Sequence, residues 1–141
     1  MEVVSLRLIV TEADLNELAS RICSWPDAIR NVRFAVIPEG IRVSGTYETG
    51  VGIPFQMLWQ VSVSEEKVVA RLGKLKAGFL SLGWVKHYLL QAIAAATTIL
   101  ELRDETLVFD VDVLLQGQGL PLRTHLTSLR CDYASLTVES G

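Results

Sequence analysis

The stretch LGWVKHYLLQAIAAATTIL, residues 82–100, decides how the rest of the chain can be arranged. Its large apolar residues recur at the three- and four-residue spacing of a helix, and only a thin, weakly polar stripe at His87, Gln91 and Thr98 interrupts them. A helix with so little polar surface must be covered on most sides. Because strand-like segments precede and follow it, we expect one long apolar helix lying along a curved sheet.

Upstream, residues 3–10 alternate as a strand, and a shorter amphipathic helix is expected over residues 12–24. Thr11 and Asp14 have the spacing of a capping box, in which each side chain accepts a hydrogen bond from the other residue's backbone. Pro26 ends this helix, since the residue before a proline disfavours helical geometry.

Four strands separated by short turns occupy the middle of the chain. They are expected over residues 32–36, 41–47, 53–63 and 68–75, with turns at Pro38-Glu39-Gly40, Thr49-Gly50-Val51-Gly52 and Ser64-Glu65-Glu66-Lys67. Consecutive strands with such short connections favour an antiparallel meander.

After the long helix, residues 106–115 alternate as a strand that places Asp110 and Asp112 on its polar face. Residues 122–139 form either one long bent strand or two short ones. The order of elements shows no alternation of strand and helix, so the predicted fold class is α+β with a curved antiparallel sheet wrapped around the long helix. At 141 residues, the chain is expected to form a single domain, residues 1–141.

Composition excludes several classes of protein. The formal charge is −3 without a basic block, which disfavours nucleic-acid binding, because neutralising phosphates requires clustered Lys and Arg. Lys86 and His87 leave too short an uncharged run for a transmembrane helix. The N-terminus lacks the basic start and cleavage site of a signal peptide, so we expect a cytoplasmic protein in which Cys23 and Cys131 are reduced.

Few residues suggest catalysis or metal binding. Asp110 and Asp112 could share a proton or hold a cation, but no third ligand has matching spacing, and we favour an exposed, dispensable strand face. His87 and His125 are the two histidines, and no motif places a nucleophile beside either. We expect no enzymatic activity, no cofactor and no metal site.

A basic cluster surrounds one strand. It comprises Lys67, Arg71, Lys74 and Lys76, which could contact an anionic head group or form a solvated strand face. We favour the solvated face and do not expect a strongly basic surface.

The sequence has more large apolar residues around the long helix than a closed core of this size clearly requires. Large apolar residues gather at the start of the long helix: Phe79, Leu80, Leu82, Trp84 and Val85, with Trp25 and Trp59 as candidates to lie nearby. The helix centre carries small residues instead, Ala92 and Ala94–Ala96. Small residues facing a sheet leave either close backbone approach or an open apolar groove.

The order and character of these segments resemble the tubular lipid-binding (TULIP) superfamily, in particular small bacterial lipid-binding-like proteins of a single unit. The resemblance lies in LRLIVTEADLNELAS (6–20), VRFAVIPEGIRVSGTYETGVGIPFQMLWQVSV (32–63), the long helix, LVFDVDVLL (107–115) and PLRTHLTSLRC (121–131). It implies a long helix wrapped by a highly curved sheet that holds acyl chains in an apolar groove.

Two functions follow as hypotheses. The first is non-enzymatic binding of a lipid or fatty-acid-like ligand between helix and sheet, with ligand-binding residues Tyr88, Leu89, Ala92, Ile93 and Ala96 on the helix and Phe55, Trp59 and Phe109 on the sheet. The second is a structural or interaction domain that forms a homo-oligomer, such as a dimer, through its apolar surface.

Overall fold

The computed structural model describes residues 5–48, 50–78 and 82–140, so residues 3, 4, 49, 79 and 80 of the expectations above lie outside it. The fold is α+β, with a six-stranded and a three-stranded antiparallel sheet and three short helices. The six-stranded sheet has the order β2-β3-β4-β5-β7-β6. Its strands are β2 (Ile29–Ile37), β3 (Gly40–Glu48), β4 (Gly52–Ser64), β5 (Lys67–Lys76), β6 (Leu100–Arg103) and β7 (Thr106–Phe109). The predicted meander of four consecutive strands is confirmed as β2 to β5.

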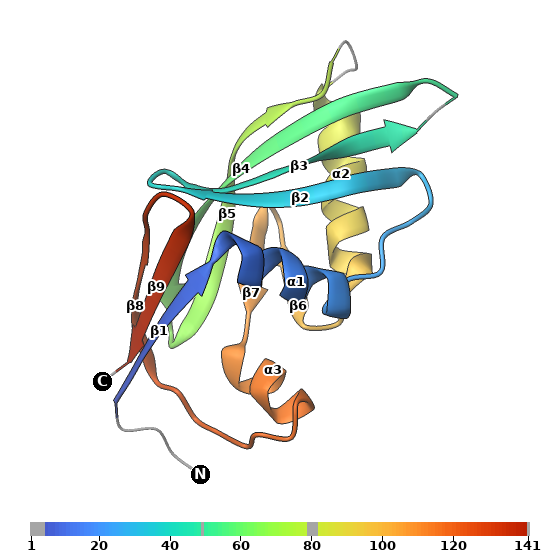
Figure 1. The fold of residues 1–141 in the computed structure, drawn as a ribbon. Coiled ribbons are helices and arrows are strands. Elements are labelled where there is room, and N and C mark those ends of the chain that lie inside the picture. The colour runs from blue at the N-terminus through green and yellow to red at the C-terminus, as the bar shows by residue number, and fades with distance from the viewer. Residues whose placement is uncertain (1–4, 49, 79–81, 141) are drawn as a thin grey trace.

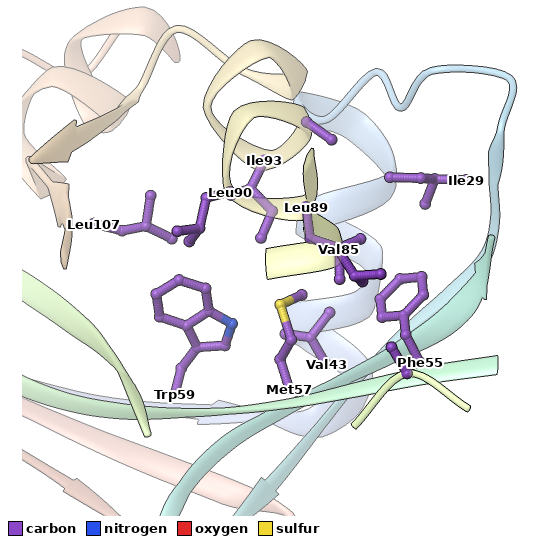
Figure 2. Packing of buried hydrophobic residues seen from close by; sticks show 12 residues of the cluster. Ile29, Val43, Phe55, Met57, Trp59, Val85, Leu89, Leu90, Ile93 and Leu107 are labelled. Atoms are coloured by element: carbon purple, nitrogen blue, oxygen red, sulfur yellow. The ribbon is translucent and has the colours of Figure 1, made fainter. Parts of the chain in front are cut away.

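One face of this sheet, the inner face, packs against helix α2 (Leu82–Ala96), which lies alongside β2 to β4 (Figure 1). Figure 2 shows the contact at side-chain level, with Leu89 and Ile93 of α2 above Met57 and Trp59 of β4. Leu89 and Met57 are each only 1% exposed. The opposite stripe of α2 is solvent-facing at His87 and Gln91, as the spacing predicted. Thr98 is also exposed but lies beyond the end of the helix.

The predicted long apolar helix of residues 82–100 is not present, because α2 has 15 residues and ends at Ala96. The Ser24 amide donates to the carbonyl oxygen of Ala96 at 2.8 Å, which satisfies one of the carbonyls left free at a helix end. Residues from Leu100 onward instead form β6, which pairs with β7. β-Branched residues at 97–99 favour this change, since their side chains are restricted in a helix.

The prediction of a strand over residues 106–115 is correct only as far as Phe109. β7 stops there, and helix α3 (Val111–Gly117) follows with Asp110 as its N-cap. The Asp110 carboxylate accepts hydrogen bonds from the amides of Asp112 and Val113 at 3.0 and 3.3 Å. Asp112 accepts from both the amide and the hydroxyl of the buried Thr124, at 3.0 and 2.7 Å. Both carboxylates thus accept structural hydrogen bonds and are half-buried, contrary to the expectation of an exposed strand face, while their dispensability for stability stays a prediction.

The three-stranded sheet has the order β1-β9-β8 and joins the two ends of the chain. Its strands are β1 (Leu6–Thr11), β8 (Leu126–Cys131) and β9 (Ser135–Ser140), which resolves residues 122–139 into two strands. Leu136 and Val138 of β9 pack with Val36 in a second apolar cluster, whose half-buried members include Val63 and Val68 of the large sheet.

Helix α1 (Glu12–Ile22) starts at the predicted capping box. The Asp14 amide donates to Thr11 Oγ1, and the Thr11 amide donates to Asp14 Oδ2, both at 3.1 Å. The helix then covers the outer edge of β2. Asn16 accepts from the Phe34 amide at 2.9 Å and donates to the Phe34 carbonyl at 2.8 Å, and the Val36 amide donates to Glu12 at 2.8 Å. Side chains of α1 thus replace a neighbouring strand at this edge.

Replacing Asn16 tests this edge protection. We expect Asn16→Ala to lower the free energy of unfolding by about 1–3 kcal/mol, because the Phe34 backbone loses both partners while part-buried. Thermal and urea unfolding measure the effect. Glu17→Ala on the exposed side of α1 is the control and removes only the surface pair with Arg21, which contributes about 0.5 kcal/mol. Equal losses in the two variants would contradict a special role for Asn16.

Candidate ligand-binding surface

The residues predicted to bind a ligand lie mostly inside the packed layer between α2 and the sheet. Six are buried: Leu89, Ala92, Ile93, Ala96, Phe55 and Trp59. The other two, Tyr88 and Phe109, are half-buried. Leu90, which the sequence reading omitted, is buried in the same cluster. The structure therefore brings most of the predicted set together, but as a filled core.

Two hollows in the surface lie elsewhere. One, of about 460 Å³, is an open depression whose lining includes Ser44, Thr46, Gln56 and Lys76. The other, of about 190 Å³, lies between α1 and β2. Neither is lined by a residue of α2, and only Phe55 of the predicted ligand residues borders one of them.

Small residues in this layer allow close packing. A Cβ added to Gly45 of β3 would lie 2.8 Å from the Phe55 ring, so that ring occupies the space above the glycine. Ala92 and Ala96 are 6% and 4% exposed, respectively. Ala92 and Ala96 are therefore buried in the layer, as close-packed interiors require.

An aromatic cluster marks the N-terminal half of α2, where the packed layer reaches the surface. Its members are Tyr47 of β3 and Trp84 and Tyr88 of α2. The ring centroids of Tyr47 and Tyr88 are 4.9 Å apart in an edge-to-face arrangement, and Trp84 stacks on Tyr88 at 6.1 Å. Trp84 is 55% exposed, whereas Val85 beside it is buried in the core. The aromatic cluster is thus an exposed apolar surface that continues into the interior.

The aromatic cluster consists of two phenols and one indole and contains no carboxylate, ammonium or guanidinium group. Partial burial, and to a smaller extent the neighbouring Tyr47, raises the pKa of the Tyr88 phenol. The nearest charged residue on α2 is Lys86, which forms an ion pair with Glu105. An uncharged surface of this kind suits an apolar ligand or an apolar partner.

The other candidate residues are dispersed. His87 is exposed on α2, and His125 precedes β8 with Nδ1 3.2 Å from a carboxylate oxygen of Glu66. Cys23 and Cys131 are separate, half-buried thiols whose pKa values burial raises. In the described part of the chain, no three metal-ligating side chains lie together.

Comparison with known proteins finds no matching family model, no similar curated protein and no similar solved structure. The resemblance to the tubular lipid-binding superfamily stays a prediction. Within residues 5–48, 50–78 and 82–140, no helix combines the length and hydropathy needed to cross a bilayer.

A tryptophan substitution distinguishes a filled layer from an open groove. We expect Ala96→Trp to lower the free energy of unfolding by about 1–3 kcal/mol, because a large side chain must displace close-packed neighbours. The neighbouring Ala95 is exposed, so Ala95→Trp is the control and should change stability by less than about 0.5 kcal/mol. Unchanged melting of Ala96→Trp would mean that open volume lies behind α2.

Proposed function

We propose that this protein is a non-enzymatic binding domain for a lipid or another long apolar molecule. The apolar chain enters at the aromatic cluster and inserts between α2 and the inner face of the six-stranded sheet. The supporting observation is that the exposed Trp84 stacks on the half-buried Tyr88, which in turn packs against the buried cluster that contains Leu89. Half-exposed aromatic rings are common where an apolar ligand or lipid meets protein.

Insertion requires movement, because the layer is filled in the free protein. A bound acyl chain gains about 0.8 kcal/mol per buried methylene, so several methylenes offset the cost of displacing side chains and ordering the chain. Among the described residues at the end of α2 that carries the aromatic cluster, one polar contact joins the helix to the sheet region. This contact is the ion pair of Lys86 with Glu105. Opening at this end leaves the opposite end of α2 held by the Ser24–Ala96 hydrogen bond.

The second candidate is a homo-oligomer that uses the aromatic cluster as its interface. The filled layer favours it, since a core this closed leaves the exposed Trp84 as the main unsatisfied apolar group on α2. In that case a second copy of the chain, and not a lipid, would cover the ring.

Loss of the two α2 rings tests both candidates. We expect the wild type to bind a fluorescent stearate analogue saturably and Trp84→Ala/Tyr88→Ala to bind it at least about tenfold more weakly, because each lost ring removes apolar contact area. Fluorescence titration measures the affinity. Tyr133→Ala is the control, since Tyr133 is 79% exposed in the turn between β8 and β9.

Sedimentation velocity of the same proteins separates the alternatives. A wild type that binds no probe but forms a dimer, with the dimer lost in the double variant, would replace lipid binding by the interaction domain. Unchanged probe affinity in a folded double variant would contradict entry at the aromatic cluster.

A further inference from the structure

The outer face of the six-stranded sheet, opposite α2, gathers cationic residues from four strands, β2, β3, β5 and β6. Directly paired residues of antiparallel strands project to the same face. The pairs Arg33–Ser44, Ser44–Gln56 and Gln56–Lys76 therefore form one row across four strands. A second row runs Ala35–Arg42, Arg42–Leu58 and Leu58–Lys74, and a third runs Gln60–Arg71, Arg71–Thr106 and Thr106–Arg103.

This register brings together more cationic residues than the four of the sequence cluster, Lys67, Arg71, Lys74 and Lys76. Eight of the thirteen Lys and Arg residues project from the outer face: Arg30, Arg33, Arg42, Lys67, Arg71, Lys74, Lys76 and Arg103. Among the described residues, the outward positions of the six strands hold only two Asp or Glu residues, Glu48 and Glu101. The rest of the sequence holds five cationic and fourteen acidic residues, so the chain is strongly polarised despite its net charge of −3.

These cations are available to a partner. All but the half-buried Lys67 are exposed. Arg103 forms a two-bond pair with Glu101 at 3.1 and 3.2 Å. Among the described residues, no other outer-face Lys or Arg has an ion-pair partner. By contrast, Arg7, Arg21 and Arg130 elsewhere on the surface each pair with a carboxylate.

The remaining outer-face residues indicate the kind of partner. Between the cations lie Ser44, Thr46, Gln56, Gln60 and Thr106, with a few aliphatic side chains, and none of the paired outer-face positions is aromatic. Sheets that bind single-stranded nucleic acid use aromatic rings on which bases stack. Six strands spread the charges over about 24 Å, which matches an extended anionic surface better than a groove.

We propose that the outer face of the six-stranded sheet docks on the surface of an anionic phospholipid bilayer. This inference does not depend on uptake of an acyl chain at the aromatic cluster, because a protein can bind head groups without inserting. The acidic remainder of the molecule is repelled by the same surface, so docking has one orientation. Each Lys or Arg near an anionic surface strengthens binding about fivefold, and screening by salt removes that gain.

Vesicle co-sedimentation tests the proposal with two triple variants of equal charge. Arg33→Gln/Arg42→Gln/Lys74→Gln neutralises the outer face, and Arg7→Gln/Arg21→Gln/Arg130→Gln removes three exposed cations elsewhere. Vesicles contain phosphatidylcholine and phosphatidylglycerol in equal amounts, or phosphatidylcholine alone, at about 0.15 M and about 1 M salt. Circular dichroism melts verify that all variants fold.

We expect the wild type to bind only the anionic vesicles and to lose binding at high salt. The outer-face triple should bind them on the order of a hundredfold more weakly, and the control triple should bind like the wild type. Absence of binding to anionic vesicles, or equal losses in the two triples, would overturn the proposal. Tighter binding of a DNA duplex than of the vesicles at the same salt would also overturn it and assign the face to nucleic acid.

Discussion

The packing of α2 on the inner face of the six-stranded sheet is the contact on which the other features depend. Leu89 of α2 and Met57 of β4 are each 1% exposed. Buried residues of β2, β3, β4 and β7 and half-buried residues of β5 converge on the same layer. An antiparallel sheet with one covered face leaves the other face to solvent. The strand residues that face α2 are therefore apolar, and most of those on the opposite face are polar. The small residues Ala92 and Ala96 of α2 are buried.

Two surfaces with different chemistry follow from this arrangement. The aromatic cluster lies where the packed layer reaches solvent, and the cationic residues project from the opposite side of the same strands. Amphipathic lipids carry an acyl chain and an anionic head group, so both surfaces suit the same class of molecule. Each surface is inferred from its own observations. The aromatic cluster is inferred from its half-exposed, uncharged rings, and the cationic face from the segregation of Lys and Arg on one side of the sheet.

The sequence predicted the parts of the fold that local patterns determine. Helical spacing located α2 and its exposed stripe, and the capping box at Thr11 and Asp14 located the start of α1. The sequence-based prediction was wrong where contacts with residues far along the chain determine whether a segment is a helix or a strand. β6 continues the apolar sequence of α2 and is a strand because it pairs with β7. VDVLLQ (111–116) has the alternation of a strand but is a helix capped by Asp110. The outer-face cations lie on four strands, so only the register brings them together.

Hydrogen exchange of the backbone amides tests most directly the claim that the α2–sheet layer is closed and organises the domain. Amides opened only by global unfolding exchange with the full free energy of unfolding. The account predicts that residues 85–93 and 53–59 exchange most slowly in the chain, at the rate that global unfolding permits. Exchange of residues 85–93 as fast as that of the turn between β8 and β9 would contradict it, because α2 would then be a loosely attached cover and not the centre of the fold.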